Sequence, residues 1–265
     1  MPTKTPSPAD FPPNLTVTVT EAPSSSPGSG PAPNILLLLH GLGDTAAGFT
    51  AFARALQLPE TTIVTLQAPT PLPFDLGGFH WGDDVSFDSA SGGLDMDAGF
   101  TRSTRILVSN IIRDTLLAKC GYQLREILLL GFGQGGMAAL MAARELDKTS
   151  KIAEVDESSS SSSTELTGSL SGVISIGAPY PLSASTLGSK NRTPVLLVGG
   201  RESTAVTDTA VQRTKEAFEF VELHRYARRG DGMPRNRDEM MPVMQFFARR
   251  LRSRQGVPAG SIEIT

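Results

Sequence analysis

The sequence is poor in the residues that most often carry covalent, acid–base or metal chemistry. Its 265 residues include one cysteine, Cys120, one tryptophan and three histidines. A single cysteine excludes an internal disulfide, and no hydrophobic leader follows a basic start, so we expect a reducing, cytoplasmic location. Any mechanism that needs an imidazole base depends on His40, His80 or His224.

Long apolar runs and an excess of charge of one sign are also missing. No apolar run approaches the ~18 residues that a membrane-spanning helix needs. Lys and Arg number 24 against 27 Asp and Glu, for a formal net charge of −3. These features argue against a nucleic-acid partner and a membrane span. They predict a globular chain that is long enough to bury a core.

Composition divides the chain into a central domain and low-complexity segments. Residues 1–33 are rich in Pro, Ser and Gly, so we expect them to be mostly disordered, apart from an alternating edge strand at 15–20. A single domain is predicted over 34–255. Six consecutive serines predict a disordered insertion at about 154–169, and 256–265 form a tail.

From Asn34 onward, short apolar runs alternate with amphipathic segments. The strands predicted from these runs are 35–39, 62–66, 126–130, 172–176, 195–198 and 220–226. The helices predicted between and after them are 49–56, 97–120, 137–146, 207–218 and 238–251. This alternation predicts an α/β fold with a mostly parallel sheet and helices on both faces. Ligands of such sheets gather at the carboxyl ends of the strands.

The turn after the strand at 126–130 carries the most informative motif, Gly131-Phe-Gly-Gln-Gly-Gly136. A strand, a sharp turn and a helix of small residues are typical of the nucleophile elbow, G-x-S-x-G, but Gly133 stands at the position of the serine. The same residues also match the dinucleotide motif G-x-G-x-x-G. The next strand ends without the acidic residue that this second motif needs, and nucleotide binding at Gly131–Gly136 stays an alternative hypothesis.

Two motifs together carry a family resemblance. His-Gly-Leu-Gly-Asp at 40–44, followed by Gly-Phe-Gly-Gln-Gly-Gly at 131–136, resembles the acyl-protein thioesterase and phospholipase/carboxylesterase family of α/β-hydrolases. The similarity extends over about 34–252. It implies the α/β-hydrolase fold and a Ser–Asp–His triad that cleaves thioesters or carboxylic esters without a cofactor.

The resemblance places the triad on residues that lack its chemistry. Its serine, aspartate and histidine fall on Gly133, Ser203 and Met233, and no histidine follows His224. We therefore expect a non-catalytic protein that binds a ligand or a partner. The alternative is an active ester or thioester hydrolase with a non-standard site, which uses Ser203 or a water near His40 or His80.

The family's oxyanion hole depends on the backbone and is expected to remain. The resemblance places its donors at the N–H groups of Leu42 and Gln134, which suit a small acyl or carboxylate-like ligand. The further candidates for a binding pocket are His40, Gly41, His80 and Trp81. His80 has no companions at a diagnostic ligand spacing, so no metal site is expected.

The segment 225–254 holds nine arginines and no lysine. On a terminal helix such a run is typical of a solvated face with ion pairs, here to Asp238 and Glu239. The alternative interpretation is a docking face for an acidic protein partner.

Overall fold

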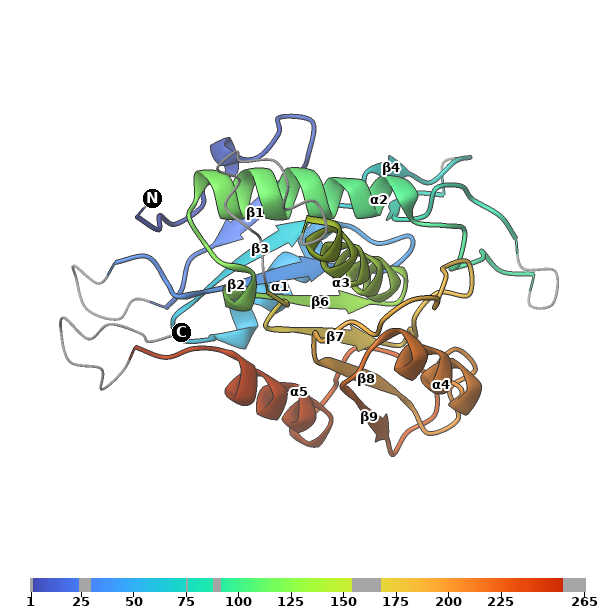
Figure 1. Ribbon diagram of the computed structural model, residues 1–265. Helices are drawn as coiled ribbons and strands as arrows, with labels where there is room; N and C mark the ends of the chain where they lie inside the picture. The colour runs from blue at the N-terminus through green and yellow to red at the C-terminus, as the bar shows by residue number, and fades with distance from the viewer. Residues whose placement is uncertain (1, 24–29, 75, 88–91, 154–167, 255–265) are drawn as a thin grey trace.

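The computed structural model describes residues 2–23, 30–74, 76–87, 92–153 and 168–254 (Figure 1). They form one large sheet, a small hairpin and helices on both faces. The strands are β1 (Val17–Thr20), β2 (Asn34–Leu39), β3 (Thr61–Leu66), β4 (Thr70–Pro71), β5 (Phe79–His80), β6 (Ile127–Phe132), β7 (Gly172–Ile176), β8 (Val195–Gly200) and β9 (Val221–Tyr226). The helices are η1 (Pro8–Asp10), α1 (Ala46–Leu56), α2 (Thr101–Arg105), η2 (Ile106–Lys119), η3 (Leu124–Glu126), α3 (Gln134–Ala153), α4 (Asp208–Ala217) and α5 (Arg237–Arg250).

The large sheet has the strand order β1-β3-β2-β6-β7-β8-β9. β1 pairs with β3 in the antiparallel sense at one edge, and the other neighbours are parallel. The predicted α/β class with a mostly parallel sheet is confirmed. The chain leaves β2 toward β3 on one side and leaves β6 toward β7 on the other. Adjacent loops therefore diverge after β2 and β6, where a parallel sheet opens a crevice.

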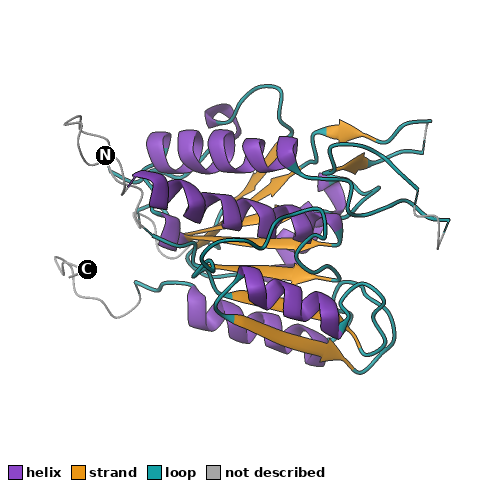
Figure 2. Cartoon of the chain, turned by 45° about the vertical axis from the view of Figure 1, so that its right-hand side comes forward, coloured by secondary structure: helices purple, strands orange, loops and turns teal. Residues whose placement is uncertain are grey.

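Helices cover both faces of the sheet (Figure 2). Two hydrophobic clusters hold them against it. Within β2, Ile35, Leu37 and Leu39 join the cluster that packs under η2, α3 and α4. The alternating Leu36 and Leu38 join a second cluster, formed with α1 and α5. Because successive strand residues point to opposite faces, a continuous apolar run is the pattern required of a strand covered on both sides.

Some local structure differs from the prediction. The segment 67–93, expected as a loop, contains the β4–β5 hairpin, whose strands are too short to leave a periodic pattern. The predicted helix 97–120 is divided into α2 and the π-helical η2. α3 runs past the predicted 137–146, to Ala153.

Part of the N-terminal segment, expected to be mostly disordered, is packed against the domain. Phe11 is buried in the larger cluster, and the N–H of Lys4 donates to the carbonyl of Cys120 at 2.9 Å. The composition of the segment did not predict this packing, because one buried aromatic side chain is enough to anchor a short polar segment. Most of the predicted insertion, 154–167, and the tail lie outside the described residues. Within the described part of the chain, no helix has both the length and the apolar character needed to cross a membrane.

Candidate active site

The turn after β6 is pressed against the end of β2 by glycines. A Cβ on Gly135 would overlap the carbonyl oxygens of Leu39 and His40, at 2.5 Å from the first of them, and a Cβ on Gly131 would overlap the backbone of Gly135. These positions tolerate no side chain, since real Cβ atoms do not approach backbone so closely. Close packing of strand and helix therefore accounts for Gly131, one of the three glycines of the dinucleotide-like motif, and for Gly135 beside it.

Gly133 occupies the centre of the turn in a left-handed conformation, with φ of +51°. Its N–H donates to the carbonyl of Ile176 at 2.8 Å, and its own carbonyl accepts from the N–H of Gly136 at 2.9 Å. The atom nearest to a Cβ built on Gly133 is Sδ of Met96, at 3.8 Å. The position thus has the strained backbone and the open space of a nucleophile elbow, without a side chain.

Two backbone donors point out of the neighbouring loops without a partner. Gln134 opens α3, so its N–H belongs to the first turn and has no intrahelical acceptor. Among the described residues, neither this N–H nor that of Leu42 makes a hydrogen bond. The side chain of Gln134 holds its surroundings in place, since Oε1 accepts from the N–H of Trp81 at 2.7 Å and Nε2 donates to the carbonyl of Met96 at 3.2 Å.

His40 braces the loop after β2 and has no free ring nitrogen. Nε2 accepts from the N–H of Ala68 at 3.0 Å, so Nδ1 carries the proton and donates to the carbonyl of Gly41 at 2.7 Å. The carbonyl of His40 in turn accepts from Nε1 of Trp81 at 2.8 Å. The side chain is fully buried, and this burial lowers the pKa of His40. A neutral imidazole with both nitrogens engaged serves structure rather than proton transfer.

His80 lies on β5 and is buried next to Trp81. Its Nδ1 finds no hydrogen-bond partner among the residues that the structure describes, and burial lowers the pKa of His80. The nearby Asp83 caps α2, accepting from the N–H groups of Thr101 and Arg102 at 2.7 and 2.8 Å. In the described part of the chain, no three His, Cys, Asp or Glu side chains gather into a site for a metal ion.

Ser203 lies in the loop after β8 and forms a short hydrogen bond across to the loop after β9. Its Oγ donates to Oδ2 of Asp231 at 2.6 Å and accepts from the N–H of Val206 at 2.7 Å. Oδ1 of Asp231 accepts from the N–H of Gly200 at 2.8 Å, and its Cβ lies 3.0 Å from a Cβ built on Gly177. Asp231 therefore lies beside the end of β7. The same strand end holds the turn after β6, because the carbonyl of Ile176, the residue before Gly177, accepts from the N–H of Gly133.

Met233 points elsewhere. It packs against the cluster under α1 and α5. The acidic residues near Ser203 in the sequence already have partners. Glu202 pairs with Arg229 at 2.9 Å, and Asp208 pairs with Arg225 at 2.8 Å. His224 lies on β9, edge-on to Tyr226. None of the three histidines meets Ser203 or Asp231.

A cavity of about 770 Å³ opens beside the elbow, between the loops that follow β5, β7 and β8. Met96, the residue nearest to a Gly133 side chain, and Met137, one turn into α3, form its inner wall. The other lining residues are Leu94, Asp95, Asp97, Pro179, Tyr180, Leu182, Thr204, Ala205, Thr207, Thr209, Ala210 and Arg213. The candidates His40, Gly41, His80 and Trp81 are not among them. His40 and Gly41 lie in the loop after β2, and the N–H of Trp81 donates to the side chain of Gln134.

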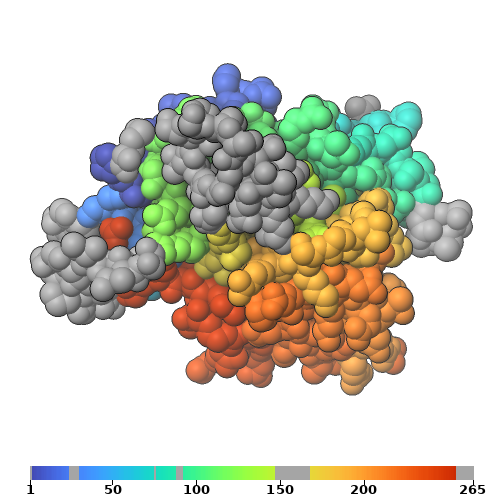
Figure 3. All heavy atoms as spheres, viewed as in Figure 1, coloured from blue at the N-terminus to red at the C-terminus, as the bar shows by residue number. Residues whose placement is uncertain are grey.

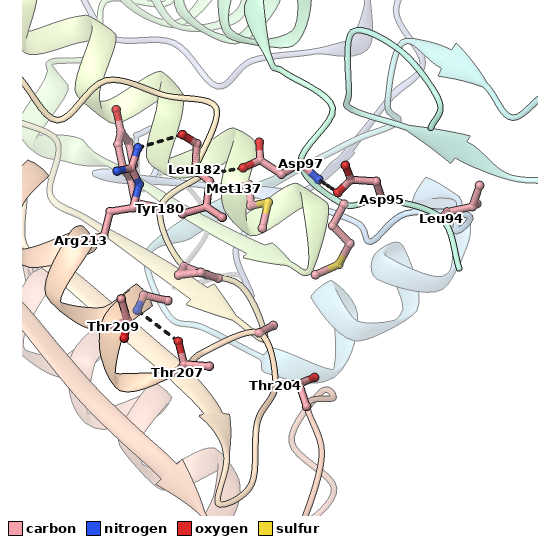
Figure 4. A pocket seen from close by; sticks show the side chains of 14 residues that line it. Leu94, Asp95, Asp97, Met137, Tyr180, Leu182, Thr204, Thr207, Thr209 and Arg213 are labelled. Carbon is pink, nitrogen blue, oxygen red and sulfur yellow. Dashed lines mark hydrogen bonds between the residues drawn. The ribbon is translucent and has the colours of Figure 1, made fainter. Parts of the chain in front are cut away.

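The outer wall of the cavity is tied down by two charged side chains. Asp97 accepts from the N–H of Leu182 and from the N–H and hydroxyl of Ser183, and Arg213 donates to the carbonyls of Pro181, Leu182 and Ala184. The two flank Leu182 from opposite sides (Figure 4). The chain after β7, yellow in the space-filling view, lies on the surface between the green segment around α2 and the orange α4 (Figure 3). The hydrogen bonds of these two charged side chains thus hold the outer wall in place, while the surface that lines the cavity is largely apolar.

Residues 22–155 match the model of the phospholipase/carboxylesterase family, which is half of the chain. The chain belongs to this family. An uncharacterized hydrolase of Schizosaccharomyces pombe is 30% identical over 194 residues, 72% of this chain and 71% of the relative. Another, of Mycosarcoma maydis, is 41% identical over 122 residues, 44% of this chain and 43% of the relative.

Solved structures extend the similarity to nearly the whole fold. Esterase PE8 superposes with a TM-score of 0.66 at 21% identity, over 89% of this chain and 99% of that one. The acyl-protein thioesterase 2 of Zea mays has a TM-score of 0.55 at 20% identity, over 88% and 97%. At these identities the likeness establishes the α/β-hydrolase fold of this phospholipase/carboxylesterase family member.

Two features of this family member escaped sequence reasoning. Asp231 was missed because the resemblance places the triad histidine on Met233. That placement assumes a fixed loop length before Glu239. The cavity was missed because Met96, Met137 and Arg213 come from three distant segments. The acid in Gly230-Asp-Gly, between two turn-forming residues, was the one local signal of a side chain held at a strand end.

Proposed function

We propose that this member of the phospholipase/carboxylesterase family binds an acyl or carboxylate-bearing ligand without serine-hydrolase catalysis. One observation carries the proposal: the left-handed elbow position is Gly133, which supplies no nucleophilic oxygen. Removing the nucleophile from a serine triad costs on the order of 10⁶ in turnover.

The neighbouring residues support the same conclusion. A triad needs an imidazole to take the proton of the nucleophile and an acid to orient that imidazole. Here a serine and a carboxylate, Ser203 and Asp231, hydrogen-bond to each other instead. Both oxygens of Asp231 already accept a hydrogen bond, and Oγ of Ser203 is held by two partners. This pair stabilises the loops and has no proton acceptor poised toward Gly133.

The binding functions of the fold do not depend on the missing side chains. The N–H groups of Leu42 and Gln134, which have no partner among the described residues, would donate to a carbonyl or carboxylate oxygen placed next to Gly133. An acyl chain attached to that oxygen would enter the cavity past Met96 and Met137, where apolar side chains suit a hydrocarbon. Thr204, in the same lining, suits a more polar end of the ligand.

The test separates binding from turnover in one preparation of the full chain. A fluorescent fatty acid is titrated into the protein, and p-nitrophenyl esters, acyl thioesters and a fluorophosphonate probe are offered as substrates. We expect saturable binding, no hydrolysis above the buffer rate and no labelling. Met137→Trp, which fills the cavity, is expected to weaken binding, whereas Met244→Trp, at an exposed position of α5, leaves it unchanged. Labelling or robust hydrolysis by the unaltered chain contradicts the proposal.

A hydrolase with a non-standard site is the second candidate, favoured by the placement of Asp231 beside Gly177. Its carboxylate would act as general base, taking a proton from a water as the water oxygen bonds to the acyl carbon, and would return that proton to the departing oxygen or sulfur as its bond to the acyl carbon breaks, which gives the acid and an alcohol or thiol. Asp231→Asn must then abolish a measured esterase activity. Activity that survives this change excludes the second candidate.

A further inference from the structure

The strand β9 forms one edge of the large sheet, and no described strand pairs with its outer side (Figure 1). On its inner side, the carbonyl of Phe220, just before the strand, accepts from the N–H of Val195 in β8 at 2.8 Å. In a parallel pair, residues that turn their backbone groups toward the neighbour alternate with residues that turn them away. The N–H and C=O groups of Val221, Leu223 and Arg225 therefore point outward, and they make no hydrogen bond within the described part of the chain.

The side chains of β9 divide between the two faces of the sheet. Arg225 pairs with the first residue of α4 at 2.8 Å, so Leu223, two positions earlier, lies on the α4 face and is 38% exposed. Glu222 points to the other face, where its Oε2 accepts from the guanidinium of Arg249 in α5 at 2.6 Å. His224 shares this second face with Glu222. The strand thus presents an apolar side chain on one face, and an acid and an imidazole on the other.

The order of these residues makes the edge complementary to itself. Two copies related by a twofold axis bring their β9 strands together in the antiparallel sense, and the outward backbone groups pair when the axis passes through Glu222, Leu223 or His224. An axis at Glu222 sets two carboxylates opposite each other, which is destabilising. An axis at His224 sets Leu223 opposite Arg225. An axis at Leu223 sets leucine opposite leucine, and Glu222 of each copy opposite His224 of the other.

We propose that the chain forms a homodimer in which β9 pairs with β9 of a second copy, in the register centred on Leu223. An imidazole N–H of His224 donates to Oε1 of Glu222 in the other copy, since Oε2 is the oxygen that Arg249 uses. Imidazole carries an N–H in both of its charge states, so this bond does not depend on protonation of His224. Each copy supplies both members of the pair and the pair forms twice, which favours a second copy over an unrelated strand.

The dimer joins the two large sheets into one continuous sheet. Because the two β9 strands run in opposite directions, the carboxyl ends of the two sheets face opposite ways. The cavities beside Gly133 therefore lie far from the twofold axis and from each other. An acyl ligand is expected to bind at one site per chain in the monomer and in the dimer alike.

The register is tested by disulfide formation in the full chain. With the axis at Leu223, the two Cα atoms of this position lie about 5.5 Å apart, within the span of a disulfide. Leu223→Cys is expected to give a covalent dimer with oxidised glutathione, seen on a non-reducing gel. Val221→Cys is the matched control and should give none, because its counterpart lies four positions along the opposite strand. The native Cys120 is buried. No dimer from Leu223→Cys, or an equal yield from Val221→Cys, overturns the register.

Sedimentation velocity measures the association itself. The mass of the unaltered chain is expected to rise from one chain to two with concentration. Leu223→Lys should weaken the dimer by about tenfold or more, because it sets two ammonium groups face to face. Leu223→Pro removes an N–H that β8 does not use, so it should also weaken the dimer while retaining the fold.

Leu187→Lys makes the same change at another leucine, 84% exposed in the segment after β7, and is expected to leave the dimer affinity unchanged. A mass of one chain at every concentration overturns the proposal. So does a dimer that both Leu223 variants leave intact, or one that Leu187→Lys weakens equally. These outcomes are independent of whether the cavity beside Gly133 binds an acyl ligand.

Discussion

The turn after β6 and the loops after β8 and β9 lie at the same edge of the sheet and differ in what they retain. The turn has a left-handed glycine, closely packed glycines and, at Gln134, an N–H without a partner among the described residues. The loops instead join Ser203 to Asp231 in a hydrogen bond that no triad contains. Elbow geometry is enforced by packing against β2, whereas catalytic side chains make few packing contacts. Under the proposed function, the backbone geometry of the turn does not depend on catalytic side chains.

The largest expected effect comes from restoring the chemistry on the retained geometry. Combining Gly133→Ser, Ser203→Asp and Asp231→His places a nucleophile, an acid and a base at the positions that the structure brings together. We expect this variant to react with a fluorophosphonate probe much faster than the unaltered chain, because removing the nucleophile from a serine triad costs about 10⁶ in turnover. The measurement is in-gel labelling against time.

The control for this variant carries Met233→His in place of Asp231→His. Since Met233 packs toward α5 rather than toward Ser203, labelling is expected to be far slower. Equal labelling of the two variants would mean that the loop after β9 rearranges freely, and that Asp231 is not the residue facing the elbow.

The next effect tests how firmly packing holds the turn. Gly135→Ala introduces a Cβ that overlaps backbone oxygens at the end of β2, and we expect a loss of about 3 kcal/mol or more in the free energy of unfolding. Gly133→Ala meets only Met96 at 3.8 Å and should cost about 1–2 kcal/mol, from its left-handed backbone alone. Urea denaturation measures both. Equal costs would show that the turn yields more easily than the contacts indicate.

The buried histidines supply a pH dependence on the same edge of the sheet. Burial lowers the pKa of His40 and of His80 below the ordinary value of 6.5, so the unfolded state binds protons more readily than the folded state. Their contribution to stability is complete above that value and is lost as the pH falls below it. We expect the free energy of unfolding to fall by up to about 1.4 kcal/mol per pH unit for each histidine.

Denaturation between about pH 8 and pH 5 measures this slope. His40→Gln is expected to lower stability at every pH but to make the slope shallower, because one of the two buried imidazoles is removed. An unchanged slope would show that His40 is not the group that titrates.

The sequence predicted those parts of the structure that depend on residues close to one another along the chain. The apolar runs of β2, β3, β6, β7 and β8 and the strand–turn–helix around Gly133 are local patterns, and each lies where it was expected. The cavity depends on Met96, Met137 and Arg213, which only the folded chain brings together. The position of Asp231 depends on the conformation of the loop between β9 and α5, which the spacing of residues before α5 does not reveal. Local periodicity thus predicted the scaffold and the elbow, and long-range contacts determined the rest of the site.

The smallest effect concerns the hydrogen-bonded pair of Ser203 and Asp231. Ser203→Ala removes the donor to Asp231 and the acceptor for the N–H of Val206, and should cost about 1–2 kcal/mol in unfolding free energy. Asp231→Asn keeps an acceptor for Ser203 and should cost less. In a double-mutant cycle by urea denaturation, a coupling of about 1 kcal/mol is expected, as for residues that share a hydrogen bond. A coupling near zero would mean that the two loops are held by their glycines and backbone alone, and that the hydrogen bond between Ser203 and Asp231 adds no stability to this edge of the sheet.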